Sequence, residues 1–154
     1  MTEHIWNVNN GTSFLFGWPP EEGQDVASKL GRMDGEGFFS AAIWPVPDGK
    51  NFGDGGFDAM RSDVYLQCAG SAERLTVELR ARVGDGFVQW VLGRSGEDAG
   101  EREERVEWPG HHTLVHHNEL HDAAGAAKLF MAYFETADVP ADTTRRILVR
   151  PPVE

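Results

Sequence analysis

The densest group of side chains capable of chemistry is a run of histidines between positions 111 and 121. Five of the six histidines of the chain fall there: His111, His112, His116, His117 and His121. Imidazole is the commonest protein ligand for metals, so the run raises the hypothesis of a zinc centre. If residues 111–117 form a strand, however, alternate side chains point to opposite faces and the set divides. We therefore expect solvated or cap-region histidines, with a small metal-dependent enzyme as the alternative.

The order of residues within this run also differs from the metalloprotease signature. In that motif a glutamate directly follows the first of two histidines on a helix, where it acts as the general base. In the segment from His117 to His121 the glutamate is Glu119, one place later, so its side chain projects in another direction. A pH response is a further interpretation, because several imidazoles with ordinary pKa values gain charge between about pH 7 and 5.5.

Other catalytic patterns do not fit the sequence. Gly93-Arg94-Ser95-Gly96 lacks the spacing of a nucleophile elbow, because the second glycine directly follows the serine. Cys68, the single cysteine, lies in an alternating apolar run without a basic neighbour, which predicts a buried and unreactive thiol. The loop from Asp48 to Asp54 has lysine at the third position of a calcium motif, and no phosphate-binding glycine pattern opens a helix. We expect no catalytic site, metal or cofactor.

The charge balance restricts the classes of partner. With 14 basic and 25 acidic residues the chain carries a net charge of −11. Such a field repels nucleic acid and anionic lipid, so a basic protein is the natural partner. The chain does not open on a signal-like segment, has no long apolar stretch and has a single cysteine. These features predict a cytoplasmic location.

Length and apolar periodicity predict one α+β domain spanning 1–154. The 40% apolar fraction, with five tryptophans and nine phenylalanines, is typical of a packed core. Residues 5–16 indicate an N-terminal hairpin that turns at Asn9-Asn10-Gly11. Pro19-Pro20 predicts the start of a helix that ends at Gly31 and turns Val26, Leu30 and Met33 inward. The continuously apolar stretch 37–46 predicts a central strand.

A meander follows in the second half of the chain. Residues 64–68, 75–81 and 87–92 alternate, which predicts three antiparallel strands with one core face and one wet face. Residues 105–108 and 113–115 then predict a fourth and fifth strand of the same sheet. Asp122 is expected to cap a helix, whose inward stripe is Ala126, Leu129, Phe130, Tyr133 and Phe134. Residues 147–149 form either a last strand or a packed tail, which gives an antiparallel sheet of five or six strands with an N-terminal and a C-terminal helix packed on it.

Two loops are candidate partner-binding surfaces. The first is rich in glycine and holds aromatics that no alternation buries; its candidate residues are Asp48, Phe52, Asp54, Phe57 and Asp58. The second is an acidic run before the fourth strand; its candidate residues are Glu97, Asp98, Glu101, Glu103 and Glu104. The alternatives are an ordinary connection for the first loop and a solubilising face for the second.

The closing helix and the corner after it carry a family resemblance. Residues 129–140 read Leu-Phe-Met-Ala-Tyr-Phe-Glu-Thr-Ala-Asp-Val-Pro, and Phe134-Glu135-Thr136-Ala137-Asp138 resembles a Phe-x-x-Thr-Gly-like corner with alanine in place of glycine. Together with Trp6-Asn7-Val8-Asn9-Asn10-Gly11 and Asp63-Val64-Tyr65-Leu66-Gln67, this pattern resembles the small immunity proteins encoded beside bacterial polymorphic toxins.

The resemblance implies a cytoplasmic, cofactor-free and non-catalytic protein that neutralises a cognate toxin by covering its active site or a neighbouring surface. Acidic charge suits a toxin that acts on nucleic acid, because such a toxin is basic. Two other functions stay open from the residues alone: the histidine-based enzyme above, and a generic adaptor or structural subunit that associates through Trp44, Trp90 or Trp108.

Overall fold

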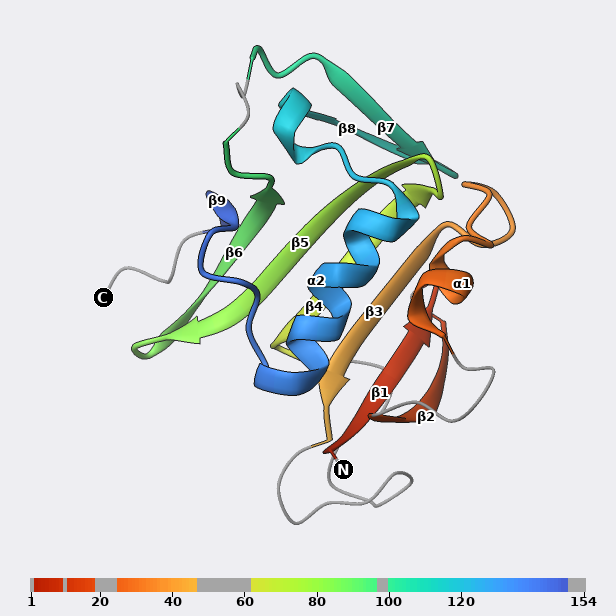
Figure 1. The fold of residues 1–154 in the computed structure, drawn as a ribbon, viewed down its shortest axis with the longest axis vertical. Coiled ribbons are helices and arrows are strands. Elements are labelled where there is room, and N and C mark those ends of the chain that lie inside the picture. Colours follow the sequence, from red (N-terminus) through yellow and green to blue (C-terminus); the bar gives the residue numbers. More distant parts are fainter. Residues whose placement is uncertain (1, 10, 19–24, 47–61, 97–99, 150–154) are drawn as a thin grey trace.

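A computed structural model of the chain describes residues 2–9, 11–18, 25–46, 62–96 and 100–149 (Figure 1). The elements in these ranges, in chain order, are β1 (Thr2–Val8), β2 (Thr12–Trp18), α1 (Val26–Leu30), β3 (Ser40–Pro45), β4 (Tyr65–Ser71), β5 (Arg74–Val83), β6 (Gly86–Gly93), β7 (Glu104–Trp108), β8 (His111–Val115), the 3-10 turn η1 (His117–Glu119), α2 (Ala123–Thr136) and β9 (Thr144–Val149).

Seven strands form one antiparallel sheet in the order β2-β1-β3-β4-β5-β6-β9. The α+β class and the antiparallel meander β4-β5-β6 are therefore confirmed, and β3 lies inside the sheet as its apolar composition predicts. The expected count of five or six strands is wrong, because the N-terminal hairpin and β9 both join the sheet. The predicted fourth and fifth strands, β7 and β8, are strands but pair only with each other in a separate two-stranded sheet.

Helix α2 lies on one face of the main sheet. Its first turn is capped by Asp122, whose carboxylate accepts a hydrogen bond of 2.8 Å from the Gly125 N–H. It ends at Ala137, which adopts a left-handed conformation with φ of 59° and donates its N–H to the Tyr133 carbonyl. The predicted inward stripe is confirmed; its buried members are Ala126, Leu129, Phe130, Tyr133 and Phe134.

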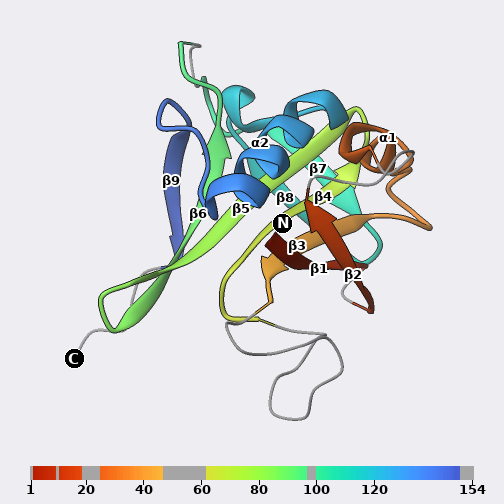
Figure 2. The ribbon, with the colours of Figure 1, turned by 60° about the horizontal axis from the view of Figure 1, so that its bottom comes forward.

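Helix α1 packs beside α2 on the same face of the curved sheet (Figure 2). Asp25 is its N-cap and accepts from the Ser28 N–H at 3.1 Å, and the helix ends before Gly31 as predicted. Val26, Leu30 and Met33 are buried. The expected start at Pro19-Pro20 lies outside the described residues. None of the described helices combines the length and apolarity needed to cross a membrane.

The core between helices and sheet is built around aromatic side chains. Trp6 and Phe16 of the first hairpin meet Phe130 and Phe134 of α2, with ring centroids between 5.1 and 6.4 Å apart. Each such ring contributes about 2–3 kcal/mol by leaving water, so this cluster fixes α2 over the N-terminal half of the sheet.

The second face of the sheet is covered in part, which corrects the expectation of one wet face. Val91 pairs with Glu78, whereas the neighbouring Trp90 pairs with Leu79 of the main core, so Val91 points away from α2. There it packs with Val106 and Val115 of the β7–β8 hairpin in a separate apolar cluster. Alternation alone could not predict that the β7–β8 hairpin packs on this face. The same alternating sequence is compatible with a second face that contacts water and with one that another layer partly covers.

Gly70 allows the hairpin to approach the sheet. Its φ is +121°, and a Cβ at this position would lie 2.2 Å from the Arg74 carbonyl oxygen and 2.8 Å from Cγ1 of Val106. Gly84 also has a positive φ, of +59°, but nothing lies within 4 Å of its Cβ position. Both positions therefore have a backbone conformation that would strain a residue with a side chain, and only Gly70 is also crowded.

We predict that Gly70→Ala lowers the free energy of unfolding by about 2–4 kcal/mol, since it adds strain and overpacking, whereas Gly84→Ala adds strain alone and costs about 1 kcal/mol. Equilibrium unfolding in urea measures both values. Equal losses in the two variants would show that the close approach at Gly70 is unimportant for stability.

Candidate functional site

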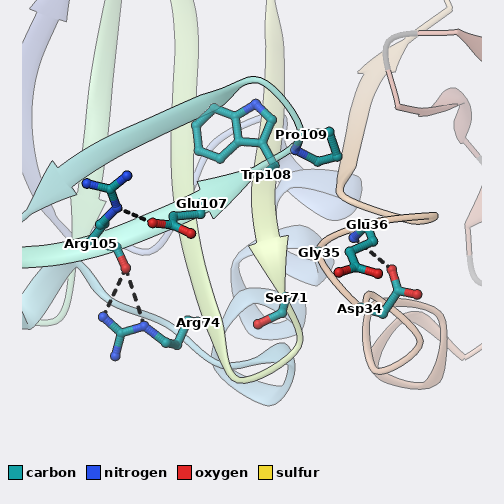
Figure 3. A pocket seen from close by; sticks show the side chains of 9 residues that line it. All are labelled: Asp34, Gly35, Glu36, Ser71, Arg74, Arg105, Glu107, Trp108 and Pro109. Carbon is teal, nitrogen blue, oxygen red and sulfur yellow. Dashed lines mark hydrogen bonds and ion pairs between the residues drawn. The ribbon is translucent and has the colours of Figure 1, made fainter.

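An open groove lies between the turn of the β7–β8 hairpin and the segment that follows α1 (Figure 3). Its volume is about 570 Å³. Its lining residues are Asp34, Gly35, Glu36, Ser71, Arg74, Arg105, Glu107, Trp108 and Pro109. The groove thus joins three segments that are distant in the sequence: the loop after α1, the β4–β5 turn region and the hairpin.

Hydrogen bonds hold the loop that forms the acidic wall. The Asp34 carboxylate accepts from the N–H groups of Phe38 at 3.1 Å and Glu36 at 2.9 Å, and these bonds, that from Phe38 first, lower the pKa of Asp34. Asn9 in the β1–β2 turn donates its side-chain amide to the Gly37 carbonyl at 2.8 Å. The loop is therefore fastened both to itself and to the first hairpin.

The hairpin wall carries arginines whose charges are already matched. The guanidinium of Arg74 donates to the Arg105 carbonyl at 3.0 and 3.3 Å and forms an ion pair of 3.2 Å with Glu104. Arg105 forms an ion pair with Glu107 on the same strand. Both pairs are exposed or partly exposed and contribute little stability, but they place a carboxylate against each cation of this wall.

Trp108 forms the aromatic part of the groove. It is half-buried, packs against the Val91, Val106 and Val115 cluster, and stacks on His111 with ring centroids 5.9 Å apart. The following Pro109-Gly110 makes the hairpin turn, with φ of +77° at the glycine. The indole is therefore held in place at the edge of the groove and not left on a free loop.

Asp34 and Glu36 distinguish this groove electrostatically. Both are exposed, and within the described part of the chain no ion pair engages either carboxylate. A preformed groove with an aromatic side and unmatched negative charge suits a cationic group of a partner. The sequence interpretation missed both acids, because the loop 34–37 has no apolar periodicity; Asp34-Gly35 followed by Gly37 was the available turn signal.

The structure describes only some of the predicted partner-binding residues, and one of these lies beside the groove. Asp48, Phe52, Asp54, Phe57, Asp58, Glu97 and Asp98 lie outside the described residues. Glu101 and Glu103 are exposed in the segment before β7, at the opposite end of that strand from Trp108. Glu104 is half-buried and pairs with Arg74, so the structure brings one predicted residue next to the groove.

The histidine run divides among different environments. His111 and His112 are exposed on β8, whereas Nδ1 of His116 lies 3.0 Å from the Gly100 carbonyl oxygen. His121 is buried and donates from Nε2 to the Leu92 carbonyl at 2.8 Å. In the ranges that the structure describes, no group of three or more histidine, cysteine or acidic side chains is placed to hold a metal ion.

The buried polar groups nearby have structural partners. Glu119 is buried and accepts two hydrogen bonds from Arg146, at 2.9 and 3.0 Å, and one of 2.8 Å from the His116 N–H. This arrangement ties η1 to β9. Cys68 is buried as predicted, lies 3.7 Å from the Met33 sulfur, and has its pKa raised to about 12 by burial.

A second cleft of about 330 Å³ lies between the hairpin and β9. It is lined by Thr76, Glu78, Val91, Arg102, His112, Thr113, Leu114, Arg146 and Leu148. Glu78 accepts a hydrogen bond of 2.8 Å from Gln89, and burial raises the pKa of this carboxyl. Glu119 holds Arg146, and the cleft also contains Arg102, so its lining combines acidic and basic side chains.

No protein-family model matches the chain, and neither a curated protein nor a solved structure does.

The environment of His121 predicts a pH dependence of stability. Burial lowers the pKa of this imidazole from its ordinary value of 6.5, so the folded protein binds fewer protons than the unfolded chain. Stability is therefore lost as the pH falls below that ordinary value. We expect the free energy of unfolding of His121→Gln to decrease less than that of the wild type between about pH 7.5 and 5.5.

Urea unfolding at the two pH values measures this difference, and His112→Gln is the control because His112 is exposed. The control should retain the wild-type dependence on pH. An unchanged dependence in His121→Gln would show that another group is responsible.

Proposed function

We propose that the chain is a non-catalytic immunity protein that binds and neutralises a basic, nucleic-acid-acting bacterial toxin domain in the cytoplasm. The observation that carries this proposal is the groove beside Trp108, whose lining combines a packed aromatic side chain with Asp34 and Glu36, two carboxylates that no ion pair among the described residues engages. The net charge of −11 extends the same preference over the whole chain.

Ion pairs within the chain neutralise several of its arginines, while many carboxylates remain exposed. Within the described residues, four ion pairs match an arginine with an acidic side chain: Arg74 with Glu104, Arg105 with Glu107, Arg145 with Asp138 and Arg146 with Glu119. Many carboxylates remain exposed; examples are Asp34, Glu36, Asp63, Glu73, Asp85, Glu101, Glu103, Glu135 and Asp142. Such a distribution accelerates encounter with a basic surface and disfavours acidic partners.

Neutralisation would follow from occupation of the toxin surface that receives nucleic acid. A domain that binds phosphate backbones presents lysine and arginine, and an acidic protein that covers those residues excludes the substrate. The groove provides an anchored centre for this contact. The loop residues Asp48, Phe52, Asp54, Phe57, Asp58, Glu97 and Asp98, together with Glu101, Glu103 and Glu104, are proposed to add further contacts with the toxin.

Co-expression with the product of a neighbouring toxin gene tests the proposal. We expect the chain to restore growth of bacteria that produce the toxin, and the two purified proteins to form a complex with a dissociation constant on the order of nanomolar. Because the attraction is electrostatic, association should slow as the salt concentration rises.

The control is an inactive form of the toxin, which should still bind the chain. Failure to restore growth, together with the absence of a complex by titration calorimetry, would contradict the proposed function.

A further inference from the structure

The cleft of about 330 Å³ between the β7–β8 hairpin and β9 has a floor that belongs to the main sheet. Glu78 on β5 pairs with Val91 on β6, and Val91 pairs with Arg146 on β9. Directly paired residues of neighbouring strands share a face, so these three side chains form one row on the face away from α2. The hairpin packs on this row through Val106 and Val115, which contact Val91.

Two threonine hydroxyls of the cleft are available to a ligand. Thr76 lies two residues before Glu78 on β5 and therefore shares its face; it is only 1% exposed and lines the cleft, so this small exposed area opens into it. Thr113 pairs with Val106 and so faces the sheet from the hairpin. No hydrogen bond to another described residue engages either hydroxyl, so water or a ligand must satisfy both.

Two guanidinium groups add positive charge to these hydroxyls. Arg102, in the segment before β7, is exposed, lines the cleft, and has no ion pair with any residue that the structure describes. Arg146 donates to Glu119 from Nε and Nη2, which fixes its guanidinium and leaves other N–H groups for a further acceptor. A planar guanidinium matches a carboxylate in shape and charge, so the free donors of the cleft suit this anion.

Glu78 is the group of the cleft that opposes an anion. Burial raises the pKa of its carboxyl, and Gln89 donates a hydrogen bond of 2.8 Å to it. A carboxyl with a raised pKa takes up a proton more readily when another anion approaches, and the proton removes the repulsion. Glu78 should therefore weaken the binding of an anion without preventing it.

The rim of the cleft is apolar. Leu114 on β8 and Leu148 on β9 both line it, and they are 45% and 49% exposed. A bare phosphate or sulfate would leave these side chains in water, whereas a ligand with an apolar body would bury part of their surface. The cleft thus combines donors for an anion with apolar surface for the rest of the same molecule.

We infer that this cleft binds a small carboxylate that has an apolar body. The guanidinium of Arg102 and the hydroxyl of Thr76 would hold the carboxylate, while Leu114 and Leu148 would contact the body. The same chemistry is present in a free aliphatic acid and in the carboxyl-terminal residue of a polypeptide. The inference does not depend on the proposed function, because this cleft shares no lining residue with the groove beside Trp108.

Nuclear magnetic resonance titration of the full chain with isocaproate, at constant ionic strength, tests the site. We expect saturable shifts of the Val91 amide and of the Leu114 and Leu148 methyl groups, with a dissociation constant on the order of millimolar. Isocaproamide has nearly the same shape without the charge, and acetate has the charge without the apolar body. Each should bind at least about five-fold more weakly.

A further arm of the titration distinguishes the two sources of the carboxylate. N-acetyl-leucine carries the same branched body and carboxylate together with the amide of a preceding residue. Tighter binding of N-acetyl-leucine than of isocaproate would identify the end of a polypeptide as the ligand. The reverse order would identify a free acid.

Single substitutions test the charges with opposite signs. Arg102→Gln removes the unpaired guanidinium and should weaken isocaproate binding about five-fold. Arg32→Gln is the matched control, because Arg32 is also exposed but lies after α1 and does not line the cleft. It should leave the affinity unchanged. Glu78→Gln removes the opposing charge while its amide oxygen can still accept from Gln89, and it should tighten binding about five-fold.

Equal affinities for isocaproate and isocaproamide, or for isocaproate and acetate, would overturn the inference. Wild-type affinity in Arg102→Gln would overturn it as well, since Arg102 is exposed and its replacement does not endanger the fold. Weaker binding in Glu78→Gln would contradict the role given to that carboxyl and with it the carboxylate as ligand.

Discussion

The contact between strand β7 and strand β4 at Gly70 is the constraint on which the candidate site depends. A side chain at this position would collide with the Arg74 carbonyl and with Val106, so only glycine lets the hairpin settle on the sheet. Val106 then packs with Val91 and Val115. Because the hairpin packs on the sheet in this position, Trp108 and Asp34 line the same groove.

The chain continues from the hairpin into a short segment whose buried polar side chains Asn118, Glu119 and His121 have partners within the chain. Glu119 binds Arg146, and the backbone of His121 exchanges hydrogen bonds of 2.8 and 2.9 Å with Leu75. These contacts connect the hairpin to the start of α2. Removing one partner of a buried hydrogen-bonded pair costs several kcal/mol, so Glu119 and His121 have a structural role.

Periodicity predicted the elements but not how all of them assemble. The stripe from Ala126 to Phe134 and the alternation from Leu75 to Leu79 each have a dominant apolar face, so their type and inward side followed directly. The pattern around Val106 and Val115 is the same whether the strands extend the sheet or pack upon it. The outcome depends on Gly70 and on the burial of Thr76, which are properties of the tertiary structure. The sequence indicates Trp108 only as a residue for association between subunits, and Asp34 lies in a loop without periodicity.

We propose that the chain acts through a preformed acidic groove that contacts a basic partner. Hydrogen–deuterium exchange of the toxin complex would locate this contact, because backbone protection reports the buried surface without any substitution. We expect slower exchange in residues 34–37 and 105–111 when the partner is bound. Protection confined to the outer strands β2 and β9, with these two segments unchanged, would contradict it.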